Sequence, residues 1–188
     1  MVGDEKVKLK GIVNIQVRSN GVVVEEFTTE NVVLYQGKAG IIKGLVNPTA
    51  ITISRMALGD SGTIPSDASV PRTVHPSATE LFHEVFRQNI QTTTTTTVDA
   101  DNSATFITIF RAVDIPITSY LDQLKPVISE VALVLVDTLL PPAVRPPVAA
   151  PDPQFPGELL FSIRTFKAIP FEAASDTTIS IKYTIMIL

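Results

Sequence analysis

The sequence predicts a mainly β protein, an antiparallel β-sandwich or jelly-roll-like domain with one or two short helices. Three observations predict this class. Apolar and polar residues alternate along several segments, which is the period of a strand with one buried face. Hydrophobic residues make up 45% of the chain and charged residues only 18%, a balance that favours a folded core over disorder. Strand patterns, roughly eight or nine of them, outnumber helical ones, as a two-sheet antiparallel architecture requires.

Residues 7–30 predict a β-hairpin. Its first strand places five apolar residues on one face, namely Val7, Leu9, Val13, Ile15 and Val17. Asn20-Gly21 is the pair that a two-residue type I′ turn favours, because both positions tolerate positive φ. With that turn Val17 faces Val24, but Ile15 faces Glu26. A β-bulge or a partner could correct this mismatch.

Residues 36–47 predict a short helix or turn that packs closely against a sheet. Ile41, Ile42 and Leu45 have helical spacing, while Gly37, Gly40 and Gly44 weaken the helix by about 1 kcal/mol each relative to alanine. The glycines match neither the dinucleotide-binding nor the P-loop spacing, so a phosphate site is not expected here.

The segment after the predicted strand 51–58 carries a helix-start signal. Gly59-Asp-Ser-Gly62 ends the strand with turn residues, and a proline-containing loop follows. Ser77-Ala-Thr-Glu80 then has the capping-box pattern, and Ser77 is expected to cap a helix that ends near Arg87. The apolar stripe of that helix would be Leu81, Phe82, Val85 and Phe86.

The second half of the chain predicts five further strands and one irregular segment. The strands are residues 92–97 (all threonine), 104–110, 128–136 (the most apolar, hence central), 159–166 and 177–188. Between the third and fourth, residues 139–157 hold seven of the 14 prolines and predict an extended arm or loop. We expect one β-sandwich domain over 1–188, with this proline-rich arm at 139–157.

Composition argues against several classes of function. There is no cysteine and no tryptophan, and only two histidines occur, so thiol chemistry and a histidine-rich metal site are excluded. No Gly-x-Ser-x-Gly elbow is present. The net charge is −4, and the basic residues form no cluster along the sequence. No run of apolar residues is long enough to span a bilayer. We therefore expect no enzyme, no cofactor or metal, no nucleic acid and no membrane.

Protein–protein contact is the function that this composition favours. A chain with few charges, a proline arm, a threonine strand and an apolar closing strand would expose apolar patches or sheet edges as a monomer. We expect a homo-oligomer, a trimer or a ring. The predicted partner-binding residues are Pro141, Pro142, Arg145, Pro146, Pro147, Pro151 and Phe155 in the arm, and Thr94 and Thr96 in the threonine strand.

Several segments resemble tail-collar and tail-fibre proteins of tailed bacteriophages in their N-terminal, virion-attaching region. The segment Ile53–Gly62 resembles that family's strand with an Ala-x-Gly-Asp turn, and Ala78–Arg87 resembles the helix that follows it. The segments Ile128–Asp137 and Glu158–Lys167 resemble the later strand pair, and Ile179–Ile187 the closing strand. The opening hairpin with Asn31 and Gly37 is also similar to other small phage virion proteins.

The resemblance implies a structural protein of the virion, assembled in the host cytoplasm, that binds other virion proteins and catalyses nothing. The first hypothesis for its function is a tail, baseplate or fibre-attachment adaptor. A capsid decoration (cement) protein that binds between coat subunits is the alternative, and a carbohydrate-binding module is a further one. Two features depart from the family: the proline arm replaces a short turn, and the repetitive shaft and receptor-binding tip of fibre proteins have no counterpart before Leu188.

Overall fold

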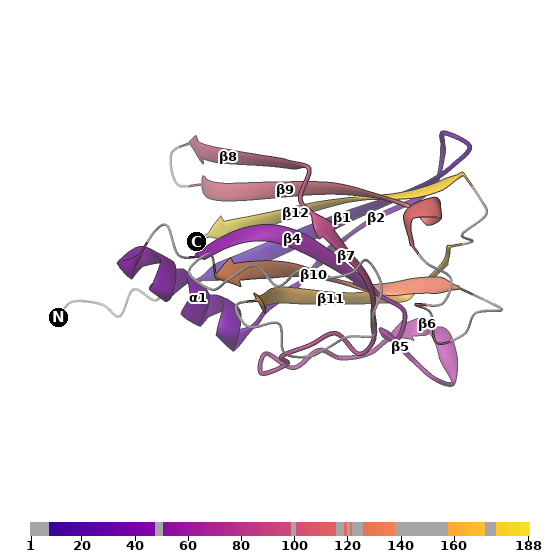
Figure 1. The fold of residues 1–188 in the computed structure, drawn as a ribbon, viewed down its shortest axis with the longest axis horizontal. Helices are drawn as coiled ribbons and strands as arrows, with labels where there is room; N and C mark the ends of the chain where they lie inside the picture. Colours follow the sequence, from indigo (N-terminus) through magenta and orange to yellow (C-terminus); the bar gives the residue numbers. More distant parts are fainter. Residues whose placement is uncertain are drawn as a thin grey trace.

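Two five-stranded antiparallel sheets form the body of the structure, a computed structural model. It describes residues 8–47, 51–98, 101–115, 119, 121, 126–137, 158–171 and 176–188. The sheets stack face to face (Figure 1), so the predicted mainly β, sandwich-like class is confirmed.

The first sheet, here sheet A, has the strand order β2-β1-β12-β9-β8. Its strands are β2 (Val22–Glu30), β1 (Leu9–Ser19), β12 (Thr177–Ile187), β9 (Asp101–Arg111) and β8 (Thr92–Val98). The second, sheet B, has the order β3-β11-β10-β4-β7. Its strands are β3 (Val32–Val33), β11 (Glu158–Pro170), β10 (Val127–Asp137), β4 (Ile51–Gly59) and β7 (Glu84–Asn89).

Three smaller groups of elements complete the described structure. Helix α1 (Tyr35–Val46) crosses one end of sheet B (Figure 1). A two-stranded sheet of β5 (Thr63–Ile64) and β6 (Asp67–Pro71) lies within the loop that follows β4, and a short 3₁₀ helix (Ala112–Asp114) follows β9.

The main core lies between the two sheets. From sheet A it takes every second residue of each central strand, as the alternating pattern predicts, including Ile15 of β1, Phe110 of β9 and Ile181 of β12. From sheet B it takes residues such as Met56 and Leu133. The closing strand β12 lies between β1 and β9, at the centre of sheet A. The idea that this strand leaves an open sheet edge is therefore wrong, because both of its backbone edges are paired.

The opening hairpin has the predicted turn, and a bulge, one of the two expected corrections, is present in its pairing. Asn20 has φ of 50° and Gly21 φ of 78°, as a type I′ turn needs. The pairing of β1 with β2 shifts between Val17 and Arg18, and the shift brings Ile15 opposite Phe27 instead of a glutamate. Val17 therefore faces Glu25 and not the expected Val24, and Phe27 is the apolar residue of β2 that packs against the core, while Val22, Val23 and Val24 are exposed.

Sheet B is buried on both faces, which explains why β10 is almost continuously apolar. On its outer face, the loop before β7 brings Val74, Ala78 and Leu81 over the sheet. They cover a second apolar cluster, whose sheet residues are Ala57, Ala132, Val134, Leu160 and Ile163. The prediction that β10 is a central strand is confirmed.

The helix expected over 77–87 is wrong, because this segment approaches sheet B in an irregular path and then joins it as β7. The Ser77 hydroxyl lies 2.7 Å from Nδ1 of His75, so it caps a local turn and no helix. The amides of Phe82 and His83 donate to the buried carboxylate of Glu130, and Glu84–Asn89 pairs with β4. Long-range partners for these backbone groups outweigh a capping signal that stabilises a helix by only about 1 kcal/mol.

Helix α1 confirms the short helix predicted after the hairpin, and glycines bring it close to the sheet. A Cβ atom built on Gly37 would lie 2.2 Å from the carbonyl oxygen of Phe161, and one on Gly40 would lie 2.4 Å from Cδ1 of Leu135. A larger residue at position 37 would clash with this backbone carbonyl, whereas one at position 40 would require the end of the Leu135 side chain to move.

We predict opposite effects for alanine at two glycines of the same helix. Gly37→Ala should lower the free energy of unfolding by about 2 kcal/mol, because backbone of β11 blocks the new methyl group. Gly44→Ala is the matched control: its Cβ would lie 3.9 Å from Cβ of Ile51, so it should stabilise the protein by up to about 1 kcal/mol. Denaturant unfolding of both variants measures the difference, and equal effects would contradict the close contact.

Candidate interaction surface

The predicted partner-binding residues fall into two groups. Those of the proline arm (Pro141, Pro142, Arg145, Pro146, Pro147, Pro151 and Phe155) lie outside the described residues. Thr94 and Thr96 lie on β8, at the margin of sheet A (Figure 1). The Thr94 side chain is exposed, and the side chain of Thr96 lies outside the described part.

The outward face of α1 is exposed and apolar. Ile42, Leu45 and Val46 are 64%, 78% and 84% exposed. Surface helices usually turn such residues toward the core. Here Gly37 and Gly40 occupy the buried side, so the large side chains of the helix face solvent.

An apolar pocket of about 260 Å³ opens beside this helix, between the ends of the two sheets. Ile41 of α1 lines it, together with Leu9 and Ile187 of sheet A and Ile53 and Phe161 of sheet B. Ile187 is also among the exposed apolar residues. We call the pocket and the outward helix residues Ile42, Leu45 and Val46 the apolar end of the molecule.

Sequence reasoning missed this surface because it treated Ile41, Ile42 and Leu45 as the packing stripe of the helix. The signal was present in the glycines: positions 37, 40 and 44 follow helical spacing and share one face. A helix that presents glycines to a sheet must present its larger residues elsewhere. Of the three apolar residues, only Ile41 packs against the main core.

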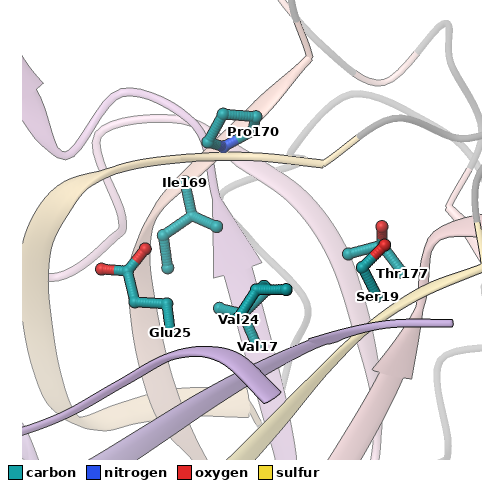
Figure 2. A pocket seen from close by; sticks show the side chains of 7 residues that line it. All are labelled: Val17, Ser19, Val24, Glu25, Ile169, Pro170 and Thr177. Carbon is teal, nitrogen blue, oxygen red and sulfur yellow. The ribbon is translucent and has the colours of Figure 1, made fainter. Parts of the chain in front are cut away.

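A second, larger pocket of about 410 Å³ lies at the opposite end of the sandwich (Figure 2). Val17 and Val24 form one wall, and Ile169 and Pro170 lie across from them. Its carboxylate, Glu25, is paired with Lys167 at 2.7 Å. Because this charge is already neutralised, the pocket offers no unpaired carboxylate to a ligand.

A buried carboxylate anchors the loops that cover sheet B. Glu130 of β10 is fully buried and accepts hydrogen bonds from the amides of Phe82 at 2.9 Å and His83 at 2.8 Å. Asp60 contacts Nδ1 of His83 at 2.7 Å and accepts a bond from the amide of Leu121 at 2.9 Å. Gly59 leaves room for the carboxylate, since a Cβ there would lie 2.3 Å from Oε1 of Glu130.

The pKa of Glu130 reflects this environment. Burial raises it from 4.5 to about 7, against the opposing effect of the amide bonds, and the nearby charge of Asp60 also raises it. The carboxyl group is held by backbone amides and closed off from solvent. Its arrangement therefore serves to position the loops, and it gives no open site for acid–base chemistry.

A largely buried ion-pair network joins three strands on the outer face of sheet B. Glu158 of β11 pairs with Arg55 of β4 and with Arg87 of β7. Arg87 also contacts Glu84 through two bonds of 2.5 Å and 2.7 Å. Arg87 was expected at the end of a helix. In the structure its ion pair with Glu158 holds the marginal strand β7 against the sheet.

The chain's described residues contain no group of three or more His, Asp or Glu side chains placed to hold a metal ion. Within the same ranges, no helix is both long and apolar enough to cross a membrane.

Comparison with known proteins assigns no family: no protein-family model matches the chain, and no curated protein matches it significantly. Of the five segments that resemble phage tail proteins, Ile179–Ile187 lies in β12 of sheet A, and the other four meet in space. They contribute β4, β7, β10 and β11, which are consecutive in sheet B in the order β11-β10-β4-β7. One of them departs from the expected pattern, because 84–89 is a strand where the family would have a helix.

The titration of Glu130 predicts a pH-dependent stability. Since its pKa is about 7 in the fold and near 4.5 when solvated, its contribution is complete below about pH 4.5 and is lost as the pH rises through about 7. Between these limits the free energy of unfolding should fall by roughly 2 to 3 kcal/mol. Glu130→Gln should be less stable at low pH, because its amide cannot accept both bonds, and should lack this slope. Denaturant unfolding across the pH range tests this, and parallel curves would contradict it.

Proposed function

We propose that the protein is a structural component of a tailed-bacteriophage virion, a tail, baseplate or fibre-attachment adaptor that acts by binding another virion protein through its apolar end. The observation that carries the proposal is the outward face of α1, where Leu45 and Val46 are more than three-quarters exposed. Assembly would take place in the host cytoplasm and leave the protein in the virion.

Burial of this surface would supply binding energy. Covering a fully exposed leucine, isoleucine or valine contributes about 1.5 to 3 kcal/mol each. Ile42, Leu45 and Val46 form one such group on α1, next to a pocket that is large enough for an inserted apolar side chain. Binding hot spots are found in well-packed pockets from which water is excluded, and this pocket could provide such an environment for a partner's side chain.

The sequence resemblance supports the choice of a virion partner. Its segments occur in the same order as in tail-collar and tail-fibre proteins, and four of the five form one continuous part of sheet B, while the closing one lies in sheet A. In this arrangement sheet B acts as the framework that holds α1, since Gly37 contacts β11 and Gly40 contacts β10.

The proposal predicts that Leu45→Asp prevents incorporation into virions while the fold persists. A charge on the helix face would have to be desolvated on binding, so affinity should fall by about a hundredfold or more. The matched control is Val113→Asp, because Val113 is 66% exposed and belongs to the 3₁₀ helix that follows β9. Phage that lack the gene are complemented with each variant, and particles are analysed by mass spectrometry and cryo-electron microscopy.

The possible outcomes distinguish a failure of the proposed virion role from a failure of the proposed binding site. Absence of the wild-type protein from particles would refute the virion role. Equal incorporation of both variants would refute the apolar end as the binding site. Wild-type density between coat subunits, and none on the tail, would favour the decoration protein over the adaptor.

The arm predicted to bind partners can be tested separately. Val136 of β10 pairs with Glu158 of β11, so the arm is an insertion between two neighbouring strands. Replacing residues 138–156 with Asn-Gly should keep the melting temperature close to that of the parent, because a two-residue turn can join such strands. We expect weaker incorporation into particles, and unchanged incorporation would contradict a binding role for the arm.

A further inference from the structure

The two sheets end in four marginal strands, and three of these carry features that oppose edge-to-edge pairing. β2 has three glutamates, at positions 25, 26 and 30, and a bulge in its pairing with β1. β7 carries Glu84 and Arg87 and has a register shift against β4. β3 is only two residues long. Charges, bulges and short length are the means by which proteins prevent uncontrolled strand addition.

The fourth marginal strand, β8, has none of these features. It is seven residues long, pairs with β9 without a register shift, and contains no charge, proline or glycine. The side chains of Thr92 to Thr95 are all exposed. On the side away from β9, alternate backbone amides and carbonyls face outward, and no hydrogen bond within the described residues covers them.

The neighbouring stretch of β9 shows that this protein does cover an open edge elsewhere. Where β9 extends past the start of β8, Gln91 accepts a hydrogen bond from the amide of Ile109 at 3.2 Å. Gln88 donates to the carbonyl of the same residue at 2.8 Å. Side-chain amides thus replace the missing strand at Ile109, while β8 is left open.

We propose that β8 pairs antiparallel with β8 of a second copy of this chain, which joins the two A sheets into one continuous sheet. A twofold axis places each residue of one strand opposite a residue of the same strand in the other copy. Because the strand is almost entirely threonine, every register brings like side chains together without opposing charges. Threonine pairs across strands are favourable.

The register in which the two β8 strands pair along their full length determines which residues lie opposite each other. With Thr92–Val98 paired along its full length, Thr95 lies at the twofold axis and faces its own copy. Thr95 also lines the apolar pocket, so the dimer would bring the pockets of both copies close to the shared strands. The contact involves only seven residues per copy, and we expect a weak, concentration-dependent dimer.

A cysteine scan tests the pairing directly, because the chain has no cysteine of its own. Single Thr→Cys variants at positions 92 to 96 are oxidised at high protein concentration, and the rate of disulfide formation is measured. Thr95→Cys should cross-link about tenfold faster than its neighbours, because only thiols directly opposite each other come within disulfide reach. Thr73→Cys, on an exposed loop, gives the rate of random collision.

Lysine variants test whether the same edge causes dimerisation. Sedimentation of the wild type should show dimers that dissociate on dilution. Thr95→Lys should weaken them by roughly tenfold, because two ammonium groups would oppose each other. Thr94→Lys, on the opposite face of the strand and away from the pocket, should weaken them too, and Thr73→Lys should not.

Three results would overturn the proposal. The first is a wild type that stays monomeric, with cross-linking at positions 92 to 96 no faster than at position 73. The second is a dimer that survives both lysine substitutions on β8. The third is a trimer or ring without a cross-linking maximum on β8, which would indicate a head-to-tail contact between different surfaces. If a lysine variant does not fold, the cysteine scan still decides, since its substitutions are small and exposed.

Discussion

Helix α1 lies against sheet B at a distance that Gly37 and Gly40 permit, and this contact decides which side chains of the helix face outward. The carbonyl of Phe161 and the side chain of Leu135 occupy the space that Cβ atoms would need. With its small residues buried, the helix has to direct Ile42, Leu45 and Val46 outward. The sheet is thereby covered at the cost of exposing an apolar helix face, which a binding partner could use.

A buried carboxylate holds the loop that covers the outer face of sheet B. Glu130 lies in the central strand and binds the amides of Phe82 and His83, and these hold the loop that covers the outer face. The ion pairs of Glu158, Arg55 and Arg87 hold β7 against the same sheet. Burial of a charged group is unfavourable unless such partners satisfy it, so the loop and the carboxylate depend on each other.

The apolar end and strand β8 would bind their partners through different interactions. At the apolar end, exclusion of water from side chains provides the energy, and shape selects the partner. At β8, backbone hydrogen bonds provide direction, and the absence of charge permits self-pairing. Thr95 and Ile41 line the same pocket, so the two surfaces adjoin. Paired β8 strands would therefore place two apolar ends near each other, which suits a component that attaches to a symmetric assembly.

Local chemistry in the sequence determined most of the strands, the Asn20-Gly21 turn with its bulge, the central position of 128–136 and the short glycine-rich helix. These depend on neighbours within a few residues or on the period of apolar side chains. The helical spacing of Gly37, Gly40 and Gly44 already indicated the buried face of α1, and only the tertiary structure showed that this face packs against the backbone of β11. It also decided that 84–89 is a strand, since Glu130, far along the chain, takes the amides that a capped helix would have used. Contacts of this kind leave no periodic trace in a sequence, because the two partners are separated by many residues that do not take part.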